Sequence, residues 1–329
     1  MDHLEQIQSN GFGKSRNIDG SLCFYEALPG EDHVSDISYA IKNEDFSAWV
    51  SLSETHADVA SRSTALALAA LLDRPAPPVE AGQAKLFPLG HWLHFTPTAA
   101  HSELGKDGHP RLGGFLPPLP LPRRMWAGSK ISFHSPITVG QPLTRTTTIE
   151  SITPKSGSSG KLCFVVLRHD LRASTVHALT EHQTLVYREA VPLDLSAASS
   201  QRPPREATEA PAGWEWSHAF TPDEVNLFMY SALTFNAHRI HYDLPYATGV
   251  EGYPGLVVHG PLSASLLVDR FLLEHPGAEI TSFEFSARSP VFVGEQIHIC
   301  GRADGNGAAE LAVFAPGGAQ AVTARLEYR

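Results

Sequence analysis

Apolar and polar residues alternate with a period of two along several stretches of the chain, and this alternation is typical of β-strands. In the first half it runs through RTTTIESIT, GKLCFVVLRHDL and HALTEHQTLVYRE, and in the second half through HICGRAD, AAELAVFAP and AVTARLEYR. Turn-forming residues such as glycine and asparagine lie between such stretches, as between antiparallel strands. The chain is therefore predicted to contain two similar sets of antiparallel strands.

Two longer apolar stretches predict helices. Residues 63–75 (STALALAALLDRP) end at a proline, and residues 260–277 (GPLSASLLVDRFLLEHPG) place Pro261 at the first helical position. Neither stretch has one clean polar face, so both helices are expected to be largely buried. A buried helix followed by antiparallel strands, occurring twice, predicts a duplicated fold in which a sheet wraps around a central helix.

A short repeat supports the duplication. SPITVGQPL (135–143) and SPVFVGEQI (289–297) share Ser-Pro, a Val-Gly pair and a closing aliphatic residue. The halves differ by a Pro/Gly-rich stretch, which predicts a long binding loop rather than a domain. The predicted organisation is an N-terminal extension (1–30), a first half (31–190) with an insertion (76–124), a linker (191–211) and a second half (212–329).

Composition favours a folded protein of a reducing compartment. The 329 residues are 42% hydrophobic and 18% charged, and the formal charge of −10 argues against nucleic acid as the main partner. Cys23, Cys163 and Cys300 are too few and too far apart for a disulfide framework, so a cytoplasmic location is expected, or a mitochondrial one in a eukaryote. No apolar run approaches the roughly 20 residues that span a membrane, so no membrane partner is expected.

The densest group of reactive side chains lies in FNAHRIHYD (235–243). An apolar run ends there in Asn236, His238, Arg239 and His241. His241 suits proton transfer because the unperturbed pKa of histidine, about 6.5, is near working pH. This stretch is the predicted site.

A metal site is not predicted. His238 and His241 have a ligand-like spacing and His259 is available, but no cysteine or acidic triplet completes a familiar set. His91 and His94 share the spacing, yet GHWLHF has the character of a strand, in which residues three apart face opposite sides.

The second half resembles the MaoC-like, R-specific enoyl-thioester hydratases. Their signature of Gly-Asp-x-Asn-Pro-aliphatic-His and a later His-Gly is matched by residues 235–241 and by His259-Gly260. The whole chain is similar to a double-hotdog subgroup, the mesaconyl-C4-CoA hydratases, itaconyl-CoA hydratases and hydroxyacyl-thioester dehydratases type 2. The segments that carry this similarity are 90–95, 107–129, 235–243 and 255–267. The resemblance implies an α+β double hotdog, with two antiparallel sheets each wrapped around a central helix.

The resemblance also implies a hydro-lyase that hydrates an enoyl thioester or dehydrates a 3-hydroxyacyl thioester. Coenzyme A or an acyl-carrier protein would carry the acyl group, and no metal or redox cofactor is expected. His241 would transfer the proton. Asn236 stands where the wider family has an aspartate, and an amide can orient water but cannot act as a general base. Gly260 would stabilise the enolate oxygen through its N–H at the start of a buried helix, because Pro261 has no N–H.

Further residues are expected around the substrate. Arg239 replaces the family's proline and would either bind a substrate carboxylate, as in mesaconyl or itaconyl thioesters, or pair with Asp243. Arg123 and Arg124 follow a rigid proline-rich segment and would either meet coenzyme A phosphates or form structural pairs. The other residues expected at the pocket are His238, His259, Tyr242 and Trp126.

Three rival functions stay open at this point. A hotdog thioesterase would need a carboxylate to activate water, and Asp243 and Glu54 are the evident candidates. A non-catalytic acyl-thioester-binding protein would fit the missing aspartate, and a biosynthetic dehydratase or cyclase would use the same scaffold. The first half has no equivalent of FNAHRIH, so it is expected to shape the acyl pocket. A homodimer is also left open.

Overall fold

The computed structural model describes residues 12–16, 22–26, 45–77, 84–157, 160–190 and 204–329. The chain forms two units, residues 1–47 and residues 48–329. In the first, β1 (Phe12–Arg16) and β2 (Leu22–Glu26) make an antiparallel hairpin. Most of the predicted N-terminal extension and linker lies outside the described residues, and the predicted domain boundaries stay predictions.

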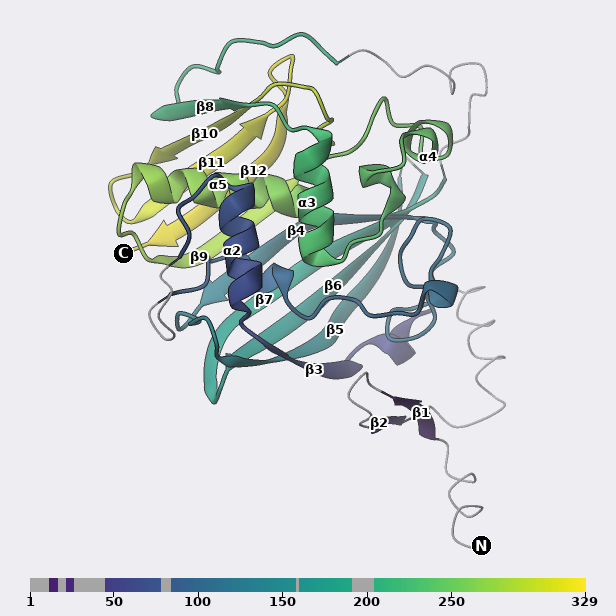
Figure 1. Cartoon of the computed structure of the whole chain (residues 1–329). Coiled ribbons are helices and arrows are strands. Elements are labelled where there is room, and N and C mark those ends of the chain that lie inside the picture. The colour runs from purple at the N-terminus through teal and green to yellow at the C-terminus, as the bar shows by residue number, and fades with distance from the viewer. Residues whose placement is uncertain (1–11, 17–21, 27–44, 78–83, 158–159, 191–203) are drawn as a thin grey trace, which may run out of the picture. The chain divides into compact units, whose positions relative to one another are not determined.

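Ten strands of the second unit form one continuous antiparallel sheet in the order β3-β5-β6-β7-β4-β9-β12-β11-β10-β8 (Figure 1). The first half contributes β3 (Ser53–Val59), β4 (Arg123–Phe133), β5 (Pro142–Gly157), β6 (Gly160–Ala173) and β7 (Val176–Arg188). The second half contributes β8 (Trp216–Phe220), β9 (Ile280–Ala287), β10 (Ile297–Ala303), β11 (Ala308–Phe314) and β12 (Gln320–Tyr328). The helices are η1 (Ser47–Trp49), α2 (Arg62–Leu71), η2 (Gly90–Leu93), η3 (His101–Glu103), α3 (Glu224–Thr234), η4 (Arg239–His241), α4 (Leu244–Gly249) and α5 (Gly260–Glu274).

The long helix α5 packs against β10, β11 and β12 of its own half and against β4 of the other half (Figure 1). It is buried on several sides, as its apolar sequence predicts, since Leu262, Ala264, Leu267, Val268 and Phe271 are each at most 1% exposed. Burying a leucine or phenylalanine side chain fully contributes roughly 1.5–3 kcal/mol. The core therefore holds α5, and with it the start of the helix, in a fixed position.

The two halves join where β4 pairs with β9. Gly128 on β4 faces Ser286 in this pairing, and a Cβ added to Gly128 would lie 2.3 Å from the carbonyl oxygen of Phe285. The strand carries an irregularity just before this point, between Trp126 and Gly128. Only glycine allows the close backbone approach of the two halves here.

The repeated SP-x-x-VG segments have equivalent places in the two halves. Thr138 forms an isolated bridge with Lys85, and Phe292 forms the matching bridge with Val257. The glycines of both segments adopt positive φ angles, +95° for Gly140 and +80° for Gly294. The internal repeat seen in the sequence is thus present in the fold.

The repeat also corrects the expected pairing of helices. After Val257 the chain enters α5, whereas after Lys85 it enters only the short η2. α2 follows the edge strand β3 as α3 follows the edge strand β8, and α2 and α3 pack against each other. The helix at 63–75 is therefore the counterpart of α3 and not of α5, and the described residues of the first half contain no long central helix.

The prediction that GHWLHF is a strand is wrong, because these residues contain the 3₁₀ helix η2. A buried carboxylate holds η2 on the sheet. Glu181 on β7 is 2% exposed and accepts hydrogen bonds from His91 at 2.9 Å and from the Trp92 indole at 3.0 Å. Burial raises the pKa of Glu181, but the hydrogen bond and charge of His91 outweigh it and hold that pKa at about 2. A short 3₁₀ helix that is hydrogen-bonded to a buried carboxylate thus takes a place that a longer helix fills in the second half.

Within the described part of the chain, no helix combines the length and the apolar character needed to cross a membrane.

Gly128→Ala tests the junction of the halves. We expect it to lower the free energy of unfolding by roughly 1–3 kcal/mol, because the added methyl group would overlap a backbone carbonyl that cannot rotate away. Gly114→Ala is the matched control, since a Cβ at Gly114 would meet nothing within 4 Å. Urea unfolding of both variants measures the difference, and equal stabilities would contradict the close approach.

Candidate active site

The end of α3 delivers the loop that carries the predicted site. Asp223 caps the start of the helix by accepting a hydrogen bond from the N–H of Asn226 at 2.8 Å. The helix ends at Thr234, and its C-cap Phe235 has a left-handed φ of 49°. The N–H of Asn236 then donates to the carbonyl of Ser231 at 2.9 Å. This C-terminal turn sends residues 236–243 back toward the start of α5.

Asn236 has a local structural role. Its Oδ1 accepts a hydrogen bond from the backbone N–H of His238 at 3.0 Å, which makes an Asx-type turn. Because an N–H needs an acceptor, this bond fixes the amide oxygen toward the loop and leaves the amide NH₂ on the other side. The NH₂ group can donate to a ligand, but the residue brings no carboxylate to the site.

His241 is fixed in one tautomer. Its ring is 8% exposed, and its Nδ1–H donates to the carbonyl of Val257 at 2.7 Å, so Nε2 carries the lone pair. Burial lowers the pKa of His241 to about 4, although the bond to the carbonyl acts in the other direction. At neutral pH the ring is therefore an uncharged proton acceptor.

Two more imidazoles surround His241. The ring of His259 stacks on it with centroids 3.6 Å apart, and the ring of His238 lies edge-on at 5.4 Å. His259 Nε2 is 2.9 Å from the hydroxyl of Ser231, which ties this cluster back to α3. Burial lowers the pKa of both His238 and His259, so all three rings are neutral at neutral pH.

Gly260 stands at the first position of α5, directly after His259. Its N–H has no acceptor within the helix, and no acceptor from another part of the described chain pairs with it. The next residue, Pro261, has no N–H to share the position. The helix dipole adds positive potential at this point, so a negatively charged oxygen is stabilised there.

Arg239, a predicted substrate ligand, is already paired. Its guanidinium contacts Asp243 Oδ2 at 2.6 Å and the carbonyl of Lys106 at 3.0 Å, and it lies over the Tyr246 ring. Of the two interpretations open from the sequence, the structure contains the ion pair. Asp243 also caps α4 through the N–H of Tyr246, which leaves it poorly placed to activate water as in a thioesterase. The side chain of Tyr242 is 56% exposed.

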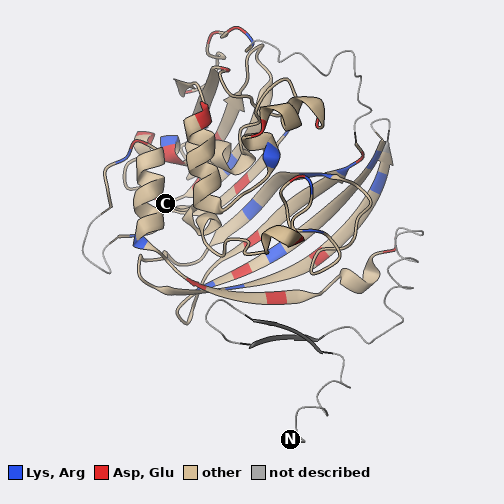
Figure 2. Cartoon of the chain, turned by 45° about the vertical axis from the view of Figure 1, so that its right-hand side comes forward, with Lys and Arg blue, Asp and Glu red and all other residues tan. Residues whose placement is uncertain are grey.

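The two arginines at the start of β4 differ in their surroundings. Arg123 pairs with Glu251 at 2.7 Å, and both side chains are mostly buried, so it is structural. Arg124 makes no ion pair with a described acidic residue, and its charge acts on His109 and His238. Arg124 is thus the one of the two that is free to bind an anion. In Figure 2 basic and acidic positions are interspersed along the strands.

Trp126 lies between the two halves. Its ring packs edge-on against Trp92 at 5.1 Å and contacts Phe285 at 6.4 Å, while its carbonyl is 3.7 Å from the position of a Cβ on Gly260. The Trp126 indole N–H donates to Ser129 Oγ, which in turn donates to Glu181. Trp126 is therefore an aromatic side chain close to the start of α5, and its place beside a substrate pocket stays a prediction.

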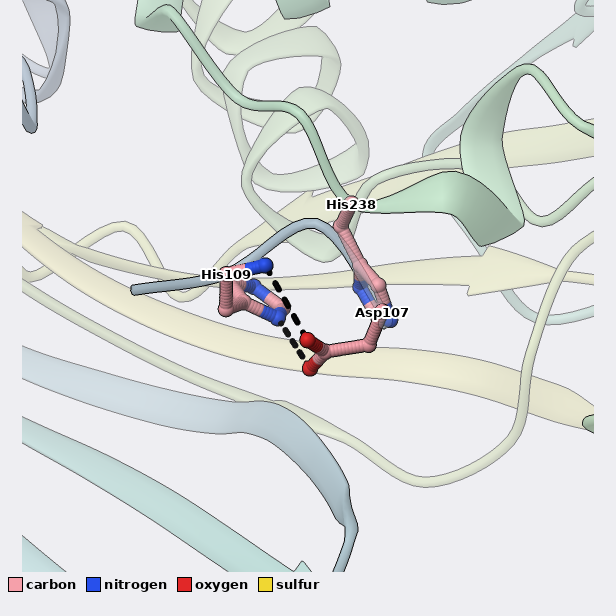
Figure 3. A group of neighbouring side chains, drawn as sticks. All are labelled: Asp107, His109 and His238. Carbon is pink, nitrogen blue, oxygen red and sulfur yellow. Dashed lines mark hydrogen bonds and ion pairs between the residues drawn. The ribbon is translucent and has the colours of Figure 1, made fainter. Parts of the chain in front are cut away.

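Two residues of this region received no role from the sequence. Asp107 and His109 belong to the Pro/Gly-rich insertion, and Figure 3 shows them meeting His238 of the second half. Asp107 Oδ2 is 2.9 Å from His109 Nδ1, and the rings of His109 and His238 are 4.2 Å apart. Both residues lie in 107–129, one of the segments that carry the similarity to the double-hotdog subgroup, and this similarity is the signal that points to them.

The polar atoms of Asp107, His109 and His238 lie within 4.8 Å of one another, a grouping that could also hold a metal ion. This set differs from the His238, His241 and His259 set considered from the sequence. His241 uses Nδ1 for the Val257 carbonyl, and His259 uses Nε2 for Ser231. His91 and His94 are likewise occupied, by Glu181 and by the N–H of Ser61.

Comparison with known proteins identifies the family of the chain. The profile of a family described as hydroxyacyl-thioester dehydratase type 2 matches residues 89–293, which include most of the insertion, the loop and α5. The chain belongs to the hydroxyacyl-thioester dehydratase type 2 family. Its reaction is the hydration of an enoyl thioester or the reverse dehydration of a 3-hydroxyacyl thioester, which confirms the predicted hydro-lyase.

Relatives of this dehydratase-family chain include a mesaconyl-C(4)-CoA hydratase of Chloroflexus aurantiacus. It is 40% identical over 288 residues, which are 87% of this chain and 99% of the relative. A mitochondrial hydroxyacyl-thioester dehydratase type 2 of Schizosaccharomyces pombe is 30% identical over 243 residues, 66% of this chain and 77% of the relative. A Mycobacterium tuberculosis protein described as a double hotdog has a TM-score of 0.55 at 14% identity, over 85% of this chain and 96% of that one. The predicted double-hotdog fold is confirmed.

Proposed function

We propose that the substrate is a short branched dicarboxylic acyl thioester of coenzyme A, of the mesaconyl-C4-CoA or itaconyl-CoA kind. The observation that carries this proposal is the 40% identity to a mesaconyl-C(4)-CoA hydratase, over 87% of this chain and 99% of that relative. A carboxylate on the acyl group needs a cation near the reacting carbons. Arg124 supports the proposal because it makes no ion pair with a described acidic residue and its charge acts on His109 and His238.

We assign the proton transfer of the hydration reaction to His241. As the oxygen of a water molecule attacks Cβ, Nε2 of His241 takes one proton of the water, and the imidazolium then gives that proton to Cα. The neutral tautomer set by Val257 supports this role, since Nε2 must begin without a proton. One water is added and the histidine returns to its starting state, so the same steps in reverse carry out dehydration.

We assign the orientation of the water or substrate to Asn236, and the stabilisation of the negative charge on the thioester oxygen to Gly260. The NH₂ group of Asn236 would donate to the water or the substrate, because its oxygen is engaged by His238. The N–H of Gly260 would bind the thioester oxygen, which gains negative charge when Cβ is attacked. His238 and His259 would form the buried wall around His241.

We extend the proposal to coenzyme A as the carrier, with no metal or redox cofactor, and to a cytoplasmic location. Arg124 would serve the acyl carboxylate or the coenzyme A phosphates, and incubation with the matching acyl-carrier-protein thioester would tell the carriers apart. Equal rates on both carriers would argue against coenzyme A as the specific carrier. Cell fractionation is the direct check of the location.

The function is tested with a panel of mesaconyl-C4-CoA, itaconyl-CoA and crotonyl-CoA, followed by mass spectrometry. We expect the two dicarboxylic substrates to gain the mass of one water without release of free thiol. His241→Ala should lower kcat by roughly 10²–10⁴-fold, because the proton acceptor is lost. Release of thiol would indicate a thioesterase, and a His241→Ala variant as fast as wild type would remove His241 from the mechanism.

Two substitutions at one position test the oxyanion role of Gly260. Gly260→Ala keeps the N–H, and its Cβ would meet Trp126 O at an ordinary 3.7 Å, so we expect a rate within about tenfold of wild type. Gly260→Pro removes the N–H at a first helical position that tolerates proline, after a residue that is already extended. We expect it to fold but to lose roughly 10²–10³-fold in kcat. Equal activities of the two variants would show that this N–H does not contact the substrate.

A further inference from the structure

The proposed mechanism places a positive charge on His241, and the loop around it lacks the aspartate of the wider family. Three carboxylates of the described residues lie in this loop or in segments close to it. Asp243 pairs with Arg239 at 2.6 Å, and Glu251 pairs with Arg123 at 2.7 Å, so each of these pairs is neutral. The third is Asp107, and its partner is an imidazole at 2.9 Å.

Asp107 is attached firmly to the loop although it comes from the other half of the sequence. Its carbonyl accepts a hydrogen bond from the N–H of Arg239 at 2.9 Å. A Cβ added to the next residue, Gly108, would lie only 1.8 Å from the carbonyl oxygen of Ala237, and the φ of Gly108 is +92°. Glycine is therefore required at 108, and the insertion approaches the loop directly beside Asn236.

The Asp107 side chain is held on two sides by His109, as Figure 3 shows. Oδ1 accepts the backbone N–H of His109 at 3.1 Å, and Oδ2 accepts Nδ1–H at 2.9 Å. Burial raises the pKa of Asp107, but the bonds and charge of His109 outweigh this and keep it below its usual range. Burial lowers the pKa of His109 more than Asp107 raises it. At neutral pH the pair is a carboxylate bonded to a neutral ring and carries one negative charge.

The pair continues into the imidazole cluster. The rings of His109 and His238 have centroids 4.2 Å apart, and those of His238 and His241 are 5.4 Å apart. We propose that Asp107, held by His109, supplies the negative charge that Asn236 does not, and stabilises the imidazolium that forms when His241 takes the proton of the water. Asp107 and His109 are positioning residues: the proton travels from water to His241 to Cα, and none passes to Asp107. This inference rests on the proposed function.

A metal ion at Asp107, His109 and His238 is the alternative use of the same atoms. The charge of Arg124 acts on both His109 and His238 and would oppose a divalent cation at this position. His109 also uses Nδ1 for Asp107, which satisfies the carboxylate without a metal. The observations favour the charge role, and metal analysis of the purified protein is one arm of the test.

The test is a cycle of Asp107→Asn and Asn236→Asp, measured as kcat/KM on mesaconyl-C4-CoA. Asp107→Asn keeps the size of the side chain and an acceptor for the N–H of His109. We expect it to lower kcat/KM about tenfold, the effect of roughly one pKa unit on the His241 cation. In the Asn236→Asp background, where the loop carries its own carboxylate, the same change should cost less than about threefold.

The control is Glu103→Gln. Glu103 belongs to the same insertion, and its carboxylate accepts a hydrogen bond from the N–H of Ala100 at 3.0 Å, apart from the imidazole cluster. It should match wild type in rate, and thermal unfolding should show that all variants are folded. A tenfold loss that Asn236→Asp does not reduce would make Asp107 merely structural and overturn the inference. So would a bound transition metal that Asp107→Asn releases in proportion to the lost activity. If wild type itself hydrates none of the substrates, the proposed function fails instead.

Discussion

The hydrogen bond from His241 Nδ1 to the carbonyl of Val257, 2.7 Å long, is the contact on which the rest of the site depends. It joins the loop that follows α3 to the segment that leads into α5. Because Val257 also forms an isolated bridge with Phe292, the repeated segment helps to hold the carbonyl in place. This one bond therefore fixes the tautomer of the imidazole and brings the ring close to the N–H of Gly260. A proton acceptor and a donor to the thioester oxygen are the two groups that hydration of an enoyl thioester needs.

The two halves of the duplicated fold differ in structure around the site. In the second half a long apolar helix begins at the site and supplies a free N–H, whereas in the first half the equivalent place holds the short η2 pinned by Glu181. The first half instead contributes an insertion whose Asp107 and Gly108 pack against the loop of the second half. The proposed proton transfer and oxyanion binding thus use residues of the second half, and the insertion of the first half packs beside them.

Several features of this protein could be predicted from its sequence because they depend on local pattern. The α5 helix and the strands follow from periodicity and from proline at a helix start, and the candidates His241 and Gly260 follow from a recognised motif. The choice of partner for Arg239 could not be predicted, since substrate and Asp243 are equally compatible with the spacing, and only the folded chain brings the guanidinium to Asp243. The prediction for GHWLHF is wrong because an apolar sequence of that length fits either a strand or a helical turn. The hydrogen bond of His91 to the buried Glu181 carboxylate favours the helical turn. Asp107 and His109 meet His238 only after the two halves fold together.

The central claim is that His241 is a neutral proton acceptor with its lone pair on Nε2. Nitrogen-15 NMR of histidine-labelled protein, with His241→Gln to assign the signal, measures this directly. The account predicts a protonated Nδ1 and an unprotonated Nε2 at neutral pH, with the ring taking up a proton only near pH 4. A His241 ring that is charged at pH 7, or one that carries its proton on Nε2, would contradict it.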